Sequence, residues 1–131
     1  MSDAVTGKQI GNLFDMIKLD DKGLIVAVIQ HVETGQVLMV GYMNKESLAI
    51  TLRDGKACFW SRSRQQLWLK GESSGNFLQV KEIRTNCDAD ALVVKCVPIG
   101  PTCHTNETSC FYRLVDSSGV VTLAGDGVAE K

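Results

Sequence analysis

The stretch GLIVAVIQHVETGQVLMVGYM, residues 23–43, decides the fold of this chain. Two apolar runs, 23–32 and 36–43, flank the segment Glu33-Thr34-Gly35, and a short loop containing glycine is typical of a β-hairpin. The stretch therefore predicts two buried, antiparallel core strands.

Helices are predicted on both sides of this hairpin. Residues 8–19 space apolar side chains at helical intervals, although Gly11 interrupts them. Residues 44–55 begin with Asn44 as a plausible N-cap and end at Gly55, which favours a second helix. After this second helix the sequence predicts strands separated by polar loops, at 56–64, 67–71, 77–85, 91–97 and 109–116. The tail, about 116–131, would add an edge strand or fray. The predicted fold class is a β-rich α+β single domain over residues 1–131.

The composition and charge of the chain limit the classes of function that it can have. With 131 residues and 44% hydrophobic side chains, the chain suits one compact domain, and its net charge of −1 indicates neither a nucleic-acid partner nor an anionic membrane. No run has the length of a membrane span and the N-terminus lacks a secretory pattern, so we expect a cytoplasmic protein. Five cysteines, an odd number, favour metal binding, catalysis or burial over a disulfide framework.

A metal site is predicted at NCDAD, residues 86–90. If the segment is extended, Asn86, Asp88 and Asp90 point one way and Cys87 the other. Carboxylates suit Mg²⁺ or Ca²⁺ and a thiolate suits zinc, so the segment could contact two ions. The alternative is that the aspartates are turn residues in a solvated loop, because aspartate is depleted in strands.

Further thiols lie downstream in CVPIGPTCHTNETSC, residues 96–110. In an extended chain Cys103 and Cys110 would be separated by over roughly 20 Å, at about 3.3 Å per residue. If both bind one ion, the segment HTNETS between them must loop back, and its turn-rich composition permits this. We assign Cys96, and likewise Cys58, to the core.

Three thiolates then remain, Cys87, Cys103 and Cys110. Three protein ligands with one open position are the pattern of a catalytic zinc, which lowers the pKa of bound water to about 7. A closed structural site that includes Cys96 or His104 is the alternative. His104 could instead transfer protons, although a lone loop histidine is usually inert.

A phosphate-binding face is predicted at SRSR, residues 61–64, and at LKGESSGN, residues 69–76. On a strand Arg62 and Arg64 would share one face, and guanidinium groups bind phosphate oxygens bidentately. A solvated edge strand followed by a loop explains the same residues. The two nearby tryptophans could stack on a base or pack in the core.

The segments 37–76, NCDAD and GPTCHTNETSCFYR resemble phosphoribosyl-AMP cyclohydrolase, the enzyme of histidine biosynthesis that opens the adenine ring of N1-phosphoribosyl-AMP. The similarity covers about 24–114. It implies an intertwined homodimer with zinc shared between chains, bound by Cys87 of one and by Cys103 and Cys110 of the other. It also implies Mg²⁺ at Asp88 and Asp90.

The resemblance further implies that zinc-bound hydroxide attacks C6 of the purine and that His104 transfers protons. The substrate contacts we expect are Trp60, Ser61, Arg62, Lys70, Glu72 and Ser74. One departure is Asn86, because the family carries aspartate there; an amide oxygen can coordinate Mg²⁺ but brings no charge. Asn106 also stands where a glycine is common.

Two other functions are alternatives to this enzyme activity. A zinc nucleobase deaminase would share the hydroxide chemistry, but its H-x-E and P-C-x-x-C signature is absent. A non-enzymatic, zinc-stabilised binding module would need a fourth protein ligand.

Overall fold

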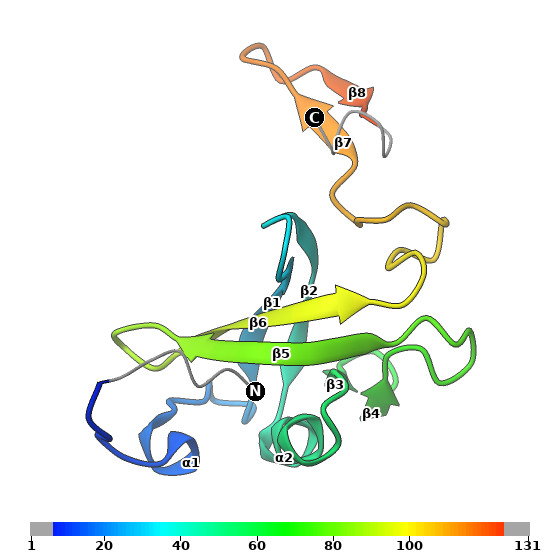
Figure 1. Ribbon diagram of the computed structural model, residues 1–131. Coiled ribbons are helices and arrows are strands. Elements are labelled where there is room, and N and C mark those ends of the chain that lie inside the picture. Colours follow the sequence, from blue (N-terminus) through cyan, green and yellow to red (C-terminus); the bar gives the residue numbers. More distant parts are fainter. Residues whose placement is uncertain (1–6, 125–131) are drawn as a thin grey trace.

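A four-stranded mixed sheet forms the centre of the molecule in the computed structural model, which describes residues 7–124 (Figure 1). The strand order is β2-β1-β6-β5; β1 runs antiparallel to β2 and parallel to β6, and β5 is antiparallel to β6. The strands are β1 (Ile25–His31), β2 (Val37–Met43), β5 (Leu78–Thr85) and β6 (Ala91–Pro98). The hairpin predicted over residues 23–43 is confirmed.

The helix predicted after this hairpin is confirmed as α2 (Lys45–Asp54). It begins with reciprocal bonds: the Ser47 amide donates to the Asn44 side chain at 2.8 Å, and the Asn44 amide donates to the Ser47 hydroxyl at 2.9 Å. These bonds satisfy donors that a helix N-terminus would otherwise leave free. The helix ends at Gly55, whose φ of 71° is the left-handed conformation that glycine adopts without strain.

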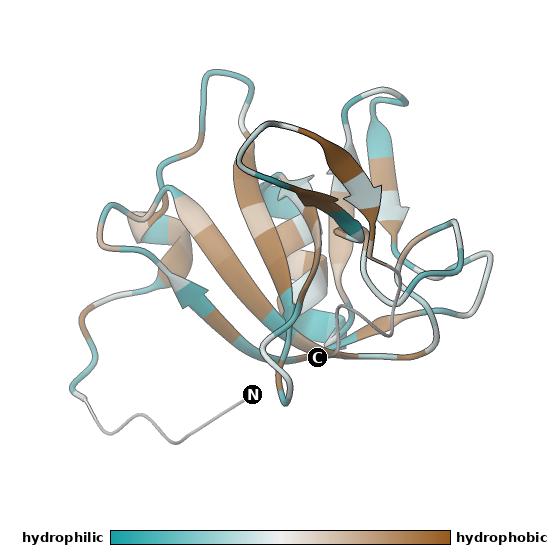
Figure 2. Ribbon diagram, turned by 90° about the horizontal axis from the view of Figure 1, so that it is seen from above, coloured by the Kyte–Doolittle hydropathy of each residue, from teal (hydrophilic) through white to brown (hydrophobic). Residues whose placement is uncertain are grey.

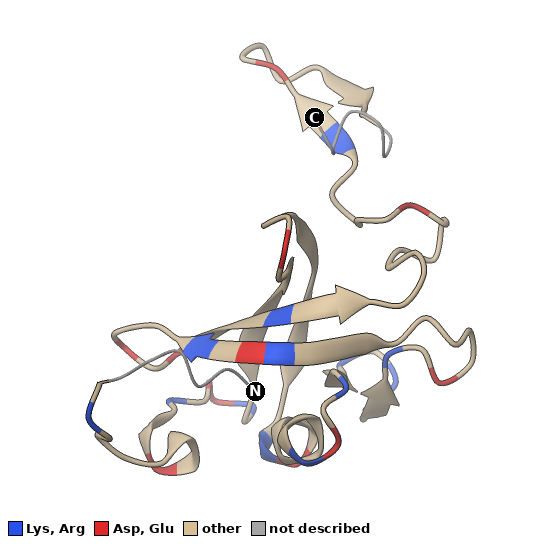
Figure 3. Ribbon diagram, viewed as in Figure 1, with Lys and Arg blue, Asp and Glu red and all other residues tan. Residues whose placement is uncertain are grey.

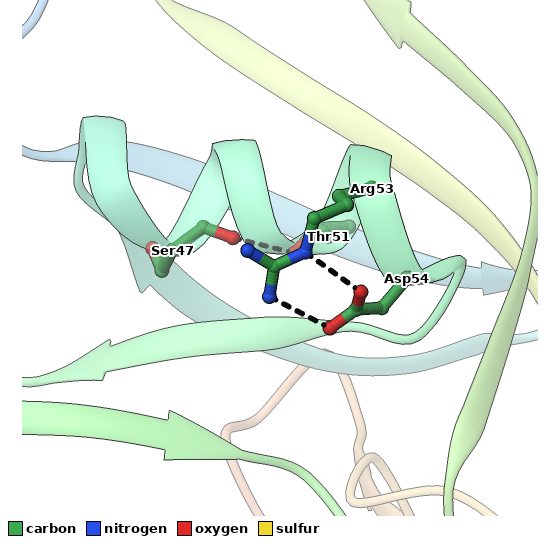
Figure 4. Close-up of polar contacts among 4 residues, drawn as sticks. All are labelled: Ser47, Thr51, Arg53 and Asp54. Atoms are coloured by element: carbon green, nitrogen blue, oxygen red, sulfur yellow. Dashed lines mark hydrogen bonds and ion pairs between the residues drawn. The ribbon is translucent and has the colours of Figure 1, made fainter.

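Thr51 connects α2 to β3 (Cys58–Ser61), the first strand of a hairpin with β4 (Gln66–Leu69). Its buried hydroxyl donates to the Ser47 carbonyl oxygen at 2.8 Å and accepts from the Cys58 amide at 3.0 Å. Figure 4 shows Thr51 beside the Arg53–Asp54 pair, which is joined by bonds of 2.9 and 3.1 Å. That exposed pair lowers the pKa of Asp54 through its hydrogen bond from Arg53 but is screened by solvent.

We expect the substitution Thr51→Val to lower the free energy of unfolding by about 1–3 kcal/mol, because it leaves the buried Cys58 amide without its acceptor. Urea unfolding followed by circular dichroism measures this. Thr34→Val, in the exposed β1–β2 turn, is the matched control. It removes the bond that the Thr34 hydroxyl accepts from the Gln36 amide at 3.2 Å, but water can replace this exposed bond, so stability should change by less than about 0.5 kcal/mol. Equal effects of the two substitutions would contradict this role of Thr51.

The two cysteines that were assigned to the core are buried, as predicted. Cys96 lies fully buried in β6 and Cys58 is 2% exposed in β3. Burial raises the pKa of the Cys96 thiol to about 12, so this sulfur stays protonated at neutral pH. Next to Cys58, the Phe59 ring packs against Gly41 so closely that a Cβ there would lie 2.6 Å from the ring. Position 41 therefore has no room for a side chain beside Phe59.

Strand β5 carries Lys81, Glu82 and Arg84, and β6 carries Lys95 (Figure 3). Glu82 accepts a hydrogen bond from Arg84, and the Lys95 ammonium lies 3.8 Å from the same carboxylate. The hydrogen bond from Arg84 lowers the pKa of Glu82. These two strands carry three cations and one carboxylate, so their charges offset one another only in part.

A second hairpin, β7 (Arg113–Val115) and β8 (Val121–Leu123), stands apart from the main sheet (Figure 1). Most residues of its two strands are apolar (Figure 2), and its exposed large side chains include Leu114, Val115, Val120, Val121 and Leu123. The described part of the tail forms β8, which pairs with β7 in this separate hairpin and adds no strand to the main sheet; residues 125–131 lie outside the described range.

The helix predicted over residues 8–19 is wrong for most of its length. Only α1 (Leu13–Met16) is helical, and Ile10 is 78% exposed instead of packing on the core. Gly11 has a φ of 156°, and Asn12 caps the short helix by accepting from the Phe14 amide. Within residues 7–124 no helix is long and apolar enough to cross a membrane.

Candidate metal and nucleotide site

The loop after β6 brings Cys103 and Cys110 together. The Cys103 amide donates to the Glu107 carbonyl at 3.1 Å, and the Asn106 amide donates to the Cys103 carbonyl at 2.9 Å. Asn106 adopts a left-handed φ of 71°, which asparagine tolerates better than most residues. The two thiols share a hydrogen bond, so the predicted reversal of HTNETS is confirmed.

This loop is fixed to the edge of the main sheet. The hydroxyl of Ser109, which is 1% exposed, donates to the Val37 carbonyl at 2.6 Å. The Cys110 amide donates to the Leu38 carbonyl at 2.8 Å. Because both acceptors lie on β2, the position of the thiol pair is set by the sheet.

The electrostatics of the pair suit a bound cation. Burial by itself raises the pKa of Cys103, but hydrogen bonds from Thr105 and Cys110 and the charge of Lys70 bring it below its usual value. Cys110 is exposed as a residue, yet desolvation of its sulfur and the neighbouring Cys103 raise its pKa to about 11. The pKa of Cys103 is thus lowered and that of Cys110 raised, and a divalent cation would favour the thiolate form of both.

His104 shares a cavity with these sulfurs. The cavity has a volume of about 390 Å³ and is lined by Cys103, His104, Cys110, Phe111, Tyr112 and Arg113. His104 is exposed, so its ring can reach a molecule bound beside the thiol pair.

The aspartate-rich segment is a turn between β5 and β6, so the extended arrangement, on which the separation of Cys87 from Asn86, Asp88 and Asp90 depended, does not occur. Ala89 has a φ of 55°, which breaks the alternation expected of a strand. Cys87, Asp88 and Asp90 are all exposed on this turn. The alternative interpretation, turn residues in a solvated loop, is confirmed for their conformation.

Asn86 stabilises that turn through its side chain. Its amide oxygen accepts from the backbone amides of Asp90 at 2.9 Å and Ala91 at 3.1 Å, and its amide nitrogen donates to the Asp90 carboxylate. Both lone pairs of the oxygen are thereby used. Asn86 therefore positions Asp90, and its oxygen does not fit a metal ligand in this arrangement.

One protomer does not bring the three predicted zinc ligands together. Cys87 precedes β6, whereas Cys103 and Cys110 follow it, and eight strand residues span roughly 26 Å. Figure 1 shows the two segments at opposite ends of the strand. Among residues 7–124 no group of three or more cysteine, histidine or acidic side chains could hold a metal ion.

The residues that were predicted to bind phosphate do not lie in one cavity. The prediction that Arg62 and Arg64 share a strand face is wrong, because residues 62–65 form the β3–β4 turn and Gln65 has a φ of 53°. Trp60 and Arg62 line one cavity, and Arg64 lines another with Ser61, Ser63 and Trp68.

The remaining expected substrate contacts follow β4. The Lys70 ammonium lies 5.7 Å from the centre of the Trp68 ring. Its charge contributes to the lowered pKa of Cys103 and opposes the rise in the pKa of Cys110. Lys70 is thus close to the thiol pair. Glu72 and Ser74 lie exposed in the following turn, where the Ser74 hydroxyl accepts from the Asn76 amide at 3.2 Å.

The sequence did not predict that the segment before β1 lines a cavity together with Asp90 of the aspartate turn. A cavity of about 450 Å³ is lined by Lys18, Leu19, Asp20, Leu24, Val26, Tyr42 and Asp90. The Lys18 amide donates to the Ala89 carbonyl at 2.7 Å, which holds this segment against the aspartate turn. No motif signalled it, and the helix wrongly predicted over residues 8–19 assigned part of it to a different structure.

Comparison with known proteins gives a consistent result. The family model for phosphoribosyl-AMP cyclohydrolase matches residues 39–112. A phosphoribosyl-AMP cyclohydrolase of Chloroherpeton thalassium is 55% identical over 105 residues, covering 80% of this chain and 75% of the relative. One of Zymomonas mobilis is 50% identical over 109 residues, 83% of this chain and 88% of the relative. A chloroplastic histidine biosynthesis bifunctional protein of Arabidopsis thaliana is 50% identical over 107 residues, 82% of this chain but 38% of the relative.

Proposed function

The chain belongs to the phosphoribosyl-AMP cyclohydrolase family of histidine biosynthesis, and we propose that its zinc centre is completed across a homodimer. Cys87 of one protomer would join Cys103 and Cys110 of the other. The observation that supports this is the roughly 26 Å of β6 between Cys87 and the thiol pair within one chain, which a second copy can bridge.

The exposed apolar hairpin β7–β8 supports the dimer. Val115, Val121 and Leu123 are 67%, 55% and 75% exposed and share one face of the hairpin, because Val115 pairs with Val121 and Leu123 lies two residues further along β8. An exposed apolar face of this kind is typical of an interface. The hairpin follows directly after Cys110 and the cavity-lining residues 111–113. A partner that covers this hairpin therefore also reaches the thiol pair, as an intertwined dimer requires.

The reaction follows from the chemistry of the substrate. Alkylation at N1 makes the adenine ring cationic, so C6 is electrophilic and N1 is a good leaving group. Zinc, when bound, supplies a nucleophile from water at neutral pH because it lowers the pKa of coordinated water to about 7. Addition at C6 followed by departure of N1 opens the ring and leaves C6 as a carboxamide.

His104 is the residue we assign to proton transfer. It lines the same cavity as the thiol pair and is exposed toward a bound molecule. Its imidazole would accept a proton from the attacking water and return it to the departing N1 nitrogen, because an imidazole can hold or release a proton near neutral pH.

Magnesium would bind at Asp88 and Asp90, whose carboxylates lie two residues apart on the β5–β6 turn. Hard oxygen ligands of this kind, completed by water and phosphate, are the environment that Mg²⁺ prefers. Asn86 would hold the Asp90 carboxylate in place instead of coordinating the ion.

The activity is tested by following the ultraviolet spectrum of phosphoribosyl-AMP with the Mg²⁺-supplemented protein, before and after zinc chelation. We expect a shift to the ring-opened product, no ammonia, and loss of the shift on chelation, because the nucleophile depends on zinc. Release of ammonia would instead indicate a deaminase. Absence of any spectral change with the zinc-loaded dimer would contradict the proposed function.

A further inference from the structure

A basic cavity of about 290 Å³ lies beside the aspartate turn, and we propose that it binds a phosphate group of the nucleotide substrate, through Lys22 and Arg62. It is lined by Lys22, Leu24, Asn44, Trp60, Arg62 and Gln65. This inference rests on the proposed function, since phosphoribosyl-AMP carries two phosphate monoesters that need binding sites.

The β3–β4 turn presents Arg62 to this cavity. The Arg64 amide donates to the Ser61 hydroxyl at 3.3 Å, and the Gln65 side chain donates to the Arg62 carbonyl at 2.7 Å. The Arg62 guanidinium then stacks on the Tyr42 ring at 4.0 Å. Stacking restricts the Arg62 side chain but leaves the N–H groups at the edge of the guanidinium free to bind in the plane of that group. A pre-oriented guanidinium suits bidentate phosphate binding.

The segment before β1 presents Lys22 from the other side. One oxygen of the Asp20 carboxylate accepts from the amides of Lys22 and Leu24, each at 2.9 Å. The Gly23 amide donates to the Asp20 carbonyl at 2.9 Å, so residues 20–24 form a tight, hydrogen-bonded turn. The backbone that carries Lys22 is fixed although its side chain is exposed.

The charges in this cavity fit an anion. Two cations and the side-chain amides of Asn44 and Gln65 line it, and no acidic residue does. Two acids line the adjoining cavity, where Asp20 is engaged by backbone amides and Asp90 is held by Asn86. A phosphate dianion placed between two cations gains charge-assisted hydrogen bonds without facing a carboxylate.

The cavity also lies where the substrate must reach. Leu24 lines both this cavity and the adjoining one that contains Asp90. The Lys18 amide is bonded to Ala89 of the aspartate turn at 2.7 Å. A nucleotide whose reacting ring lies near Cys87 can therefore extend along this surface and place a phosphate between Lys22 and Arg62 of the same protomer.

The test compares Lys22→Ala, Arg62→Ala and Arg62→Lys with Lys81→Ala, an exposed lysine of β5 that lines neither cavity. We measure the KM for phosphoribosyl-AMP with the metal-loaded dimer, and the Kd for the same compound with metal-stripped dimer, which does not consume it. Each alanine variant should raise both constants about 10- to 100-fold with kcat little changed, because a charge-assisted contact is lost. Arg62→Lys should recover part of the loss.

The outcomes separate this inference from the proposed function. Turnover by the wild type with unchanged KM and Kd in both alanine variants would overturn the phosphate subsite and leave the function intact. No turnover by the wild type would refute the function itself. Competition by AMP identifies the phosphate: weaker AMP inhibition of Lys22→Ala assigns the adenosine 5′-phosphate to the subsite, and unchanged AMP inhibition with raised KM assigns the phosphate of the second ribose.

Discussion

Replacing Cys87 by serine is expected to remove zinc from the protein and to reduce kcat/KM by more than about 10³-fold, because losing the metal removes both the nucleophile and its stabilisation of developing charge. The substitution lies on an exposed turn, so it should leave the fold intact. The loss is measured as zinc content per protomer, together with the spectrum of product formation.

The matched control for this prediction is Cys96→Ala. Cys96 is buried in β6 with its thiol pKa raised to about 12, so it is neither accessible nor readily ionised. Its replacement should lower stability, by about 1–2 kcal/mol for a small buried side chain, while zinc is retained. Loss of zinc from Cys96→Ala would favour the closed, four-ligand structural site and contradict the catalytic centre.

Replacing His104 by alanine is expected to lower kcat about 10²- to 10⁴-fold while zinc content stays the same, because a positioned acid–base group contributes that much to proton transfer. The exposed position of His104 in the cavity of the thiol pair supports this role without requiring it as a ligand. Single-turnover kinetics and metal analysis of the same sample separate the two effects.

The other histidine of the chain, His31, provides the control. The Nδ1 atom of His31 accepts from the Glu33 amide at 3.1 Å in the β1–β2 turn, and it is not one of the residues we place in the site. His31→Ala should therefore retain wild-type kcat. If His104→Ala loses zinc, then His104 is a fourth ligand, and the binding-module interpretation gains support over the enzyme mechanism.

Local sequence signals predicted those elements that local physics determines. The hairpin over residues 23–43 and the helix α2 both follow from adjacent turn and capping residues, and both are confirmed. The helix expected over 8–19 failed because apolar spacing alone does not fix a helix next to Gly11, whose φ is 156°. The parallel pairing of β1 with β6 joins strands that are distant in the sequence, and no local pattern indicated it.

The sequence predicted one part of the candidate site and did not predict others. The reversal that joins Cys103 and Cys110 follows from the requirement that two ligands of one ion meet, and the structure contains it. For the aspartate segment the sequence left an extended strand and a solvated turn open, and the structure has the turn, in which Ala89 takes a left-handed φ and Asn86 bonds across it. Lys22 was missed because only the folded chain brings it to Arg62.

The most direct test of the shared zinc centre is the activity of a mixed dimer. Cys87→Ser and Cys103→Ser protomers are co-expressed with different tags, and dimers carrying both tags are purified. If Cys87 acts with the partner's thiol pair, one centre of the two is intact and the mixed dimer should recover about half of the wild-type activity and zinc, although each homodimer is inactive. A mixed dimer as inactive as its parents, or failure to form one, would contradict the account.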